Sequence, residues 1–371
     1  MGVIGTDWSK RISAGARAWS CVCQSDNGKI VIAGVAGGYL YISTNYGYSF
    51  TEITTAGSAT WVAIACSSNG AIIYAAANND YIYYSNDTGA TWTAQTSSGQ
   101  RAWRGICCTA AGPKAYASFT GTPGQLCVST ADNGTTWTVR SNGTTTNWLV
   151  RGITCNRGAV PNDGKIVIIA SYRNTNTQQL IKSQDWGVNF NVFHNPDNTS
   201  GGYFVDVFCE RNGAGVIAVN AIPGGNSCIY TADAVSFPPP VTWTKVSTAD
   251  PGDYFTACSA TTVSSDDVDR CRIAGGNSII VSIDNGAFTK PTAMIDQTIV
   301  DVYMAGVGDW CAAVTSRDGE TVNPGFIWIS PTPPEPLVTY DKIEQTILDP
   351  TLINASPVKQ IPDFTVKSKN Y

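Results

Sequence analysis

Six charged residues could do chemistry because they recur at matched places along the chain. They are Arg17, Arg101, Arg104, Arg151, Asp206 and Asp301. Arg104 and Arg151 occupy the same position in two similar segments, and Asp206 and Asp301 take comparable positions in later ones. Guanidinium groups hold carboxylates through paired hydrogen bonds, so these residues could bind an anionic ligand. They could equally be paired charges that tie neighbouring structural units together.

A complete catalytic set is not recognisable around these residues. Glutamates are few, and only Glu210 lies near this part of the chain. Because no nucleophile can be recognised, an acid–base pair cannot be assigned at the spacing that glycosidases need. The twelve cysteines form no CxxC pair with the spacing of metal ligands, and His194 is the single histidine. We therefore expect no catalytic residues, no metal site and no cofactor.

The segments in or next to which Arg17, Arg101, Arg104, Arg151 and Asp206 lie share one pattern. Each begins with an aromatic or apolar residue and is rich in Ala, Cys and Gly. The copies are AWSCVCQSDNG (18–28), TWVAIACSSNG (60–70), AWRGICCTAAG (102–112), LVRGITCNRGA (149–159) and YFVDVFCERNG (203–213). A strand that is small and apolar on both faces is typical of the inner edge of a wedge-shaped sheet packed between neighbours.

A second motif, a Ser- or Thr-led turn that ends in an aromatic residue, recurs six times. The clear copies are STNYGYSF (43–50), SNDTGATW (85–92), TADNGTTW (130–137) and SQDWGVNF (183–190), and worn copies start at 231 and 282. Strand-like runs precede and follow these turns, so each turn closes a hairpin. Successive turns start roughly 40 to 50 residues apart, a spacing that fits one four-stranded propeller blade.

This turn is similar to the Asp-box, or BNR, repeat of sialidases, sortilin-type receptors, photosystem assembly factors and many viral and bacterial surface proteins. The resemblance covers roughly residues 6–330. In those families the Asp-box is a structural turn at the periphery, so the resemblance implies a structural role for Asp87, Asp132, Asp185 and Asp284. Sialidases also use an arginine triad, a Tyr/Glu nucleophile pair and an Asp acid/base, but their N-terminal Arg-Ile-Pro type motif is absent here.

The expected fold is an all-β, seven-bladed β-propeller of four-stranded blades over residues 1–330. A seventh unit without a turn motif runs from about Ile299 to Ser330 and stops where its outer strand should begin. Residues 6–10 resemble the strand that follows the turns, so we expect the N-terminal strand to complete this last blade. Residues 331–371 contain repeated prolines and too little apolar sequence for a core, which predicts an extended C-terminal arm.

Composition narrows the classes of partner and compartment. Charged residues make up 14% of the chain, the formal net charge is −5, and no basic stripe is present, so nucleic acid is not an expected partner. Neither a signal peptide nor a membrane span is visible, so we expect no membrane insertion. Most cysteines fall at equivalent strand positions, which predicts buried free thiols and no disulfide framework.

The leading functional hypothesis is a non-enzymatic structural or attachment component of a larger assembly, most plausibly a virion capsid or tail protein. It would lie in the virion or at a cell surface without a cleavable signal peptide. Its partners would be neighbouring protein subunits, bound through residues 331–371, with a cell-surface glycan as a further candidate. Two alternatives stay open. One is a sialidase-like carbohydrate-active enzyme, and the other is an intracellular, cytoplasmic assembly factor of the photosystem type.

Overall fold

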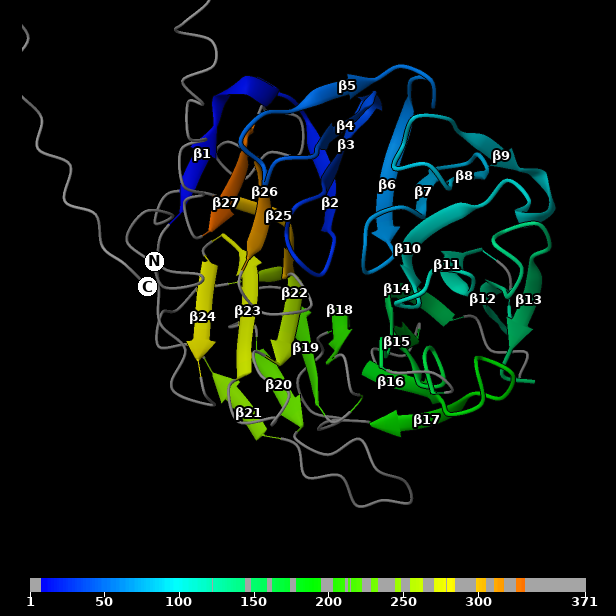
Figure 1. Ribbon diagram of the computed structural model, residues 1–371. Helices are drawn as coiled ribbons and strands as arrows, with labels where there is room; N and C mark the ends of the chain where they lie inside the picture. The colour runs from blue at the N-terminus through cyan, green and yellow to red at the C-terminus, as the bar shows by residue number, and fades with distance from the viewer. Residues whose placement is uncertain are drawn as a thin grey trace, which may run out of the picture. The chain divides into compact units, whose positions relative to one another are not determined.

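Short antiparallel sheets, all but one of them built from strands close together in the sequence, are the repeating unit of the structure (Figure 1). The structure is a computed structural model. It describes residues 8–330 apart from 122, 144–147, 159–161, 174–177, 195–202, 211–212, 214, 222–227, 233–243, 248–253, 263–269, 278, 284–297, 305–309 and 317–324. The chain divides into two compact units, Met1–Pro333 and Pro334–Tyr371. The predicted arm, residues 331–371, lies outside the described residues.

We number the sheets as blades in chain order. Blade 1 contains β2 (Trp19–Gln24), β3 (Val31–Gly38), β4 (Leu40–Ser43) and β5 (Thr51–Ile53); blade 2 contains β6 (Ala59–Cys66), β7 (Ile73–Ala77), β8 (Ile82–Ser85) and β9 (Thr93–Gln95). Blade 3 contains β10 (Ala102–Cys108), β11 (Ala115–Thr120), β12 (Gln125–Thr130) and β13 (Thr138–Ser141); blade 4 contains β14 (Trp148–Cys155), β15 (Val167–Arg173), β16 (Gln178–Ser183) and β17 (Asn191–His194).

The remaining blades follow the same order. Blade 5 contains β18 (Tyr203–Cys209), β19 (Val216–Ala221), β20 (Cys228–Ala232) and β21 (Thr244–Ser247). The described strands of blade 6 are β22 (Phe255–Thr262), β23 (Arg270–Gly276) and β24 (Ile279–Ile283). Blade 7 contains β25 (Thr298–Met304), β26 (Cys311–Ser316), β27 (Ile327–Ser330) and β1 (Ser9–Arg11). Two 3-10 turns, η1 (Ile12–Ala14) and η2 (Thr96–Ser98), precede the inner strands of blades 1 and 3.

The first unit closes on itself through its inner and its outer strands. The inner strands contact one another in the order β2, β6, β10, β14, β18, β22, β25 and back to β2, around the common centre visible in Figure 1. In blade 7, β1 pairs with β27, with Ser9 opposite Ile329 and Arg11 opposite Ile327. The prediction that the N-terminal strand completes the last blade is therefore confirmed. Residues 9–11 are paired, and residues 6 and 7 of the predicted strand lie outside the described residues.

One apolar cluster fills the space between each pair of neighbouring blades. The cluster between blades 1 and 2, for example, joins Leu40 and Ile53 of one blade to Trp61 and Ile73 of the next. Every inner strand thus buries both faces, which is why small residues are needed on it. Cys66, Cys108, Cys155 and Cys209 end their inner strands, and all four are buried. The eleven cysteines with described side chains are free thiols, as the strand pattern predicts.

The Asp-box aspartates are used inside their own turns. In blade 2, Ser85 Oγ donates to Asp87 Oδ1 at 2.8 Å and accepts from Gly89 N at 2.9 Å, while Thr91 N donates to Asp87 Oδ1 at 2.9 Å. The Thr91 hydroxyl also donates to Asp87 Oδ2 at 2.6 Å, and this bond, followed by that of the Thr91 N–H, lowers the pKa of Asp87. Asp132 and Asp185 make equivalent contacts in blades 3 and 4. Asn45 takes the place of Asp in blade 1, and Asp284 lies outside the described residues.

Candidate functional site

A cavity of about 610 Å³ runs along the centre of the blades and is lined by residues of all seven inner strands. At or near its start each of these strands carries a buried aromatic or apolar residue, called here the opening residue: Trp19, Trp61, Trp103, Val150, Phe204, Phe255 and Ile299. The register shifts directly after every one of them. A β-bulge re-aims the side chains beside it. The sevenfold bulge therefore sets which residues line this channel.

Arg104 and Arg151 directly follow the opening residues of blades 3 and 4. Both line the channel, Arg104 with an exposed side chain and Arg151 with a half-buried one. Val62, Val205 and Val300 hold the matching position in blades 2, 5 and 7 and also line the channel. The end of the channel where the inner strands begin thus combines two adjacent cations with apolar side chains.

Arg17 and Arg101 lie elsewhere. Their Nε atoms donate to the carbonyl oxygens of Ala14 and Ser98, each at 3.0 Å and each at the end of a 3-10 turn. The guanidinium groups stack on the rings of Tyr41 and Phe119 at 4.5 and 4.3 Å. Neither arginine lines the channel. The sequence analysis grouped them with Arg104 and Arg151, but local stacking and these backbone contacts hold them within their own blades.

Asp206 and Asp301 sit at the same position of blades 5 and 7, two residues after the opening residue, and both line the channel. Asp206 Oδ2 accepts the N–H of Cys258 in blade 6 at 2.9 Å, and Asp301 Oδ2 accepts the N–H of Val22 in blade 1 at 2.8 Å. Each carboxyl group thus joins its blade to the next. Hydroxyl groups do the same at two other seams, where Thr154 accepts from Cys209 N and Ser259 from Met304 N.

The protein around the two channel carboxyl groups changes their acidity. Both are half-buried and face the channel, so water still reaches them. Burial raises the pKa of Asp206 to about 7, although the hydrogen bonds from the N–H groups of Cys258 and Val207 act to lower it. Burial likewise raises the pKa of Asp301 to about 7, and the charge of Asp206 adds to that rise.

Glu210, the one glutamate near the repeat pattern, has a different partner. It is fully buried and forms an ion pair with Arg272, whose Nη2 lies 3.1 Å from Glu210 Oε1. The pair connects the end of β18 to β23, so Glu210 joins blade 5 to blade 6. It does not line the channel among the described residues.

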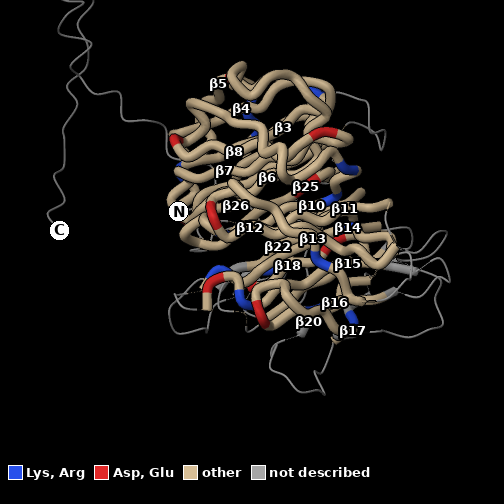
Figure 2. Tube along the Cα trace, turned by 90° about the vertical axis from the view of Figure 1, so that its right-hand side faces the viewer, with Lys and Arg blue, Asp and Glu red and all other residues tan. Residues whose placement is uncertain are grey.

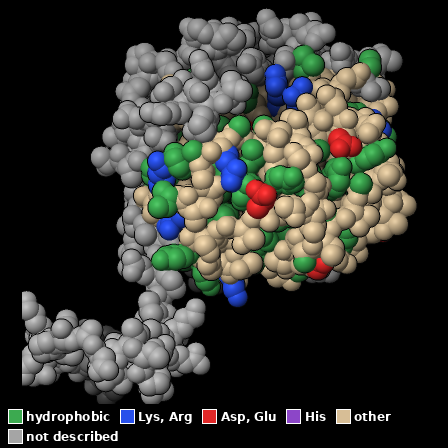
Figure 3. All heavy atoms as spheres, turned by 90° about the horizontal axis from the view of Figure 1, so that it is seen from above, with side chains coloured by type: hydrophobic (Ala, Val, Ile, Leu, Met, Phe, Trp, Pro, Cys, Tyr) green, Lys and Arg blue, Asp and Glu red, His purple; other side chains and the backbone are tan. Residues whose placement is uncertain are grey.

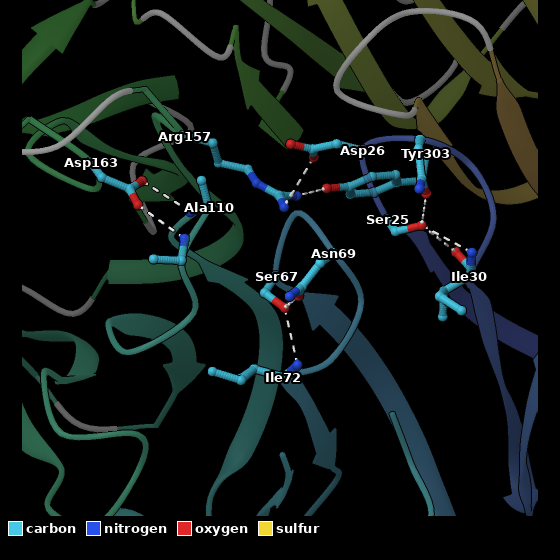
Figure 4. A network of polar contacts seen from close by, with 12 residues as sticks. Ser25, Asp26, Ile30, Ser67, Asn69, Ile72, Ala110, Arg157, Asp163 and Tyr303 are labelled. Carbon is cyan, nitrogen blue, oxygen red and sulfur yellow. Dashed lines mark hydrogen bonds and ion pairs between the residues drawn. The ribbon is translucent and has the colours of Figure 1, made fainter. Parts of the chain in front are cut away.

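The other end of the channel carries a polar network that the sequence analysis missed (Figure 4). Arg157, which follows β14, lies across the channel and reaches residues from two other blades. Its Nη2 lies 3.2 Å from Asp26 Oδ1, and its Nη1 donates to the hydroxyl of Tyr303. Asp163 fixes the neighbouring turn by accepting from the N–H groups of Ala110 and Ala111 at 3.0 and 3.2 Å.

A signal for this network was present in the sequence. Asp26 and Arg157 both lie seven residues after the opening residue of their inner strand, so equivalent positions of blades 1 and 4 hold opposite charges. Both residues lie within the repeated segments 18–28 and 149–159, but their opposite charges were not matched in predicting the site. Tyr303 could not have been found in this way, because only packing shows that its hydroxyl faces Arg157.

The surface offers few other charged clusters. Figure 2 shows Lys, Arg, Asp and Glu dispersed along the trace, and Figure 3 shows them in a few small groups among mostly uncharged atoms on the face seen there. Within the described ranges, no three His, Cys, Asp or Glu side chains gather closely enough to hold a metal ion. No helix in that part of the chain is long and apolar enough to cross a membrane.

Comparisons with known proteins agree with this architecture. The family described as "Sortilin, neurotensin receptor 3" (Sortilin-Vps10) matches residues 38–221. No curated protein matches the chain. This family model matches just under half of the chain, and with the solved structures below it supports a β-propeller with Asp-box (BNR) repeats that is similar to the sortilin propeller.

Several solved structures share the fold at low sequence identity. YCF48 from Cyanidioschyzon merolae superposes with a TM-score of 0.63 at 10% identity, covering 87% of this chain and 98% of that one. A structure of YCF48 bound to D1 peptide gives a TM-score of 0.58 at 10% identity, covering 88% and 97%. An ancestral GH74 enzyme gives 0.61 at 12% identity, and there the match covers 87% of this chain but 47% of the enzyme.

Proposed function

We propose that this Asp-box β-propeller is a non-enzymatic binding protein that holds an acidic segment of a partner protein at the end of its channel where Arg104 and Arg151 lie. The observation that carries the proposal is that both arginines, at the matching position of two neighbouring blades, line one channel together with apolar side chains. Guanidinium groups offer paired donors to carboxylates, and the valine side chains give apolar residues of the same segment a place to pack.

The channel carboxyl groups argue against a carbohydrate-active enzyme, the first alternative from the sequence. Asp206 and Asp301 each accept a backbone N–H from the next blade. A glycosidase needs two carboxyl groups facing one bond, one of them as acid and the other as base or nucleophile. The likeness to a GH74 enzyme concerns the fold, and folds of this kind host many functions.

The solved structures favour a peptide-binding role over the virion capsid or tail component that the sequence suggested first. A propeller of the same fold has been seen with a bound D1 peptide. By analogy we propose an intracellular assembly factor, the second alternative of the sequence analysis. Residues 331–371 stay proposed as a segment that contacts a neighbouring protein subunit, and a glycan ligand stays a lesser possibility.

Fluorescence anisotropy with a labelled eight-residue peptide of alternating Glu and Ala tests this function. We expect saturable binding that weakens as salt rises, and a loss of at least tenfold in affinity in Arg104→Ala/Arg151→Ala. Arg140→Ala is the matched control, because it removes a guanidinium from the outer strand β13. Equal binding by the channel variant, or equal binding of a Lys/Ala peptide, would contradict the proposal, as would turnover of sialyl or aryl-glycoside substrates that depends on Arg104 or Arg151.

A further inference from the structure

Both basic and acidic side chains line the channel, and only some of them keep the same charge throughout the physiological pH range. The titratable or charged residues that line it are Arg104, Arg151, Arg157, Cys107, Cys108, Cys155, Asp206, Cys258, Asp301 and Tyr303. Arginine stays protonated throughout the physiological range. Burial raises the pKa of the thiols of Cys107, Cys108 and Cys258 and of the Tyr303 hydroxyl well above their ordinary values.

The two carboxyl groups are the variable charges of this set. Asp206 packs beside the backbone of Gly152, next to Arg151, so closely that a Cβ on Gly152 would lie 2.4 Å from Asp206 Oδ1. Besides burial, the groups that act on Asp301 are the N–H groups of Val22 and Val302 and the charge of Asp206, and Asp301 in turn helps to raise the pKa of the Cys21 and Cys258 thiols. The described cation–carboxylate pairs do not include either aspartate. His194, the one side chain that ordinarily titrates near neutral pH, lies in the outer strand β17.

A ligand in the channel would interact with the charges of both aspartates. Both aspartates face the same cavity as Arg104 and Arg151, and each holds its place by accepting an N–H from the next blade. A carboxyl group can accept that bond through its carbonyl oxygen when protonated and through either oxygen when ionised. The seam contact therefore survives a change of protonation, and what changes is the net charge of the channel.

We infer that Asp206 and Asp301 make binding in the channel depend on pH: an acidic segment binds tightly when both carboxyl groups are protonated and weakly when both are ionised. This inference rests on the proposed binding of an acidic segment beside Arg104 and Arg151. When ionised, Asp206 beside Arg151 and Asp301 in blade 7 offset the two guanidinium groups, because like charges in a partly dry cavity repel the incoming carboxylates. The raised pKa of each aspartate puts the change near neutral pH.

The test measures affinity for the same Glu/Ala peptide between pH 6.0 and 8.5 at constant ionic strength. In this range the glutamates of the probe and the arginines keep their charges, so a pH effect reports on groups of the protein. We expect affinity to fall about tenfold from pH 6.0 to 8.5, the size of two screened Coulomb repulsions at channel distances. Asp206→Asn/Asp301→Asn should bind as tightly at pH 8.5 as at 6.0. Asp87→Asn, in a peripheral turn, is the control and should keep the wild-type pH slope.

The outcomes separate this inference from the proposed function. Binding that is strong and equal at both pH values would overturn the inference and leave the function standing. A pH slope that persists in the double Asn variant would also overturn it, because other groups would then be responsible. Absence of binding at pH 6.0 would overturn both.

Discussion

Arg157 of blade 4 lies 3.2 Å from Asp26 of blade 1, measured between Nη2 and Oδ1, so one side chain connects opposite sides of the channel. Its second contact, to the Tyr303 hydroxyl, reaches blade 7. Both side chains of the ion pair are nearly buried, at 12% and 9% exposed. Removal of one partner of a buried pair leaves the other charge in a poorly solvated place, which is costly.

Arg157→Ala should therefore lower the free energy of unfolding by about 2 to 3 kcal/mol. Arg157→Lys keeps the charge but loses the planar fork that reaches two partners at once, and we expect an intermediate loss. Chemical denaturation monitored by tryptophan fluorescence measures both effects. Lys29→Ala, at an exposed site in the turn after Asp26, is the control. A stability of Arg157→Ala equal to that of the control would show that the network contributes nothing.

Stability should also depend on pH through the channel aspartates. Their folded pKa of about 7 lies above the ordinary value of 3.8, so between these limits the folded state binds more protons than the unfolded chain. The contribution is fully present below about pH 4 and is lost as pH rises through 7. Because channel water screens both groups, we expect a loss of about 2 kcal/mol per carboxyl group, less than the full shift implies.

Denaturant titrations of wild type, Asp206→Asn and Asp301→Asn at pH 5, 6, 7 and 8 measure this loss. The difference between wild type and each variant cancels the contributions of titrating groups on which the replaced aspartate does not act. The free energy of unfolding of each Asn variant should rise relative to that of wild type as pH rises. The reason is that the Asn amide still accepts the N–H of the next blade but carries no charge. A difference that is constant over this range would mean that neither carboxyl group titrates there.

The fold could be predicted from the sequence because each blade repeats the same short-range sequence pattern. Ser85, Asp87 and Gly89 form a turn whose contacts lie within a few residues, so spacing alone locates it. Inner strands such as Ala59–Cys66 are readable because both faces are small and apolar. The site was only partly predictable, since Arg101 and Arg104 are three residues apart yet a bulge directs one into the channel while stacking on Phe119 holds the other away.

The Asp-box turns should respond to substitution according to the bonds that they keep. Asp87→Ala loses the acceptor for the Ser85 hydroxyl and the Thr91 N–H, and we expect a loss of about 1 to 2 kcal/mol. Asp87→Asn should cost less, because Asn45 makes the equivalent contacts in blade 1. Thermal unfolding followed by circular dichroism ranks the two variants. The reverse order, with Asn worse than Ala, would show that the charge of Asp87 and not its acceptor geometry stabilises the turn.

Closure of blade 7 by the N-terminal strand makes the strongest prediction about folding. Trp8, directly before β1, is 5% exposed and packs with Ile299, Val302 and other residues of the cluster between blades 6 and 7. Trp8→Ala should lower the free energy of unfolding by about 3 to 5 kcal/mol, since it removes a large buried side chain.

Deletion of residues 1–11 should lower the free energy of unfolding further, because it also exposes the edge of β27 and favours association through that edge. Ile12→Ala is the matched control, as Ile12 lies three residues beyond Ser9 and is 78% exposed. Differential scanning calorimetry and light scattering report stability and association together. If the deletion variant stays monomeric and melts with the Ile12→Ala control, the N-terminal strand does not hold the ring closed.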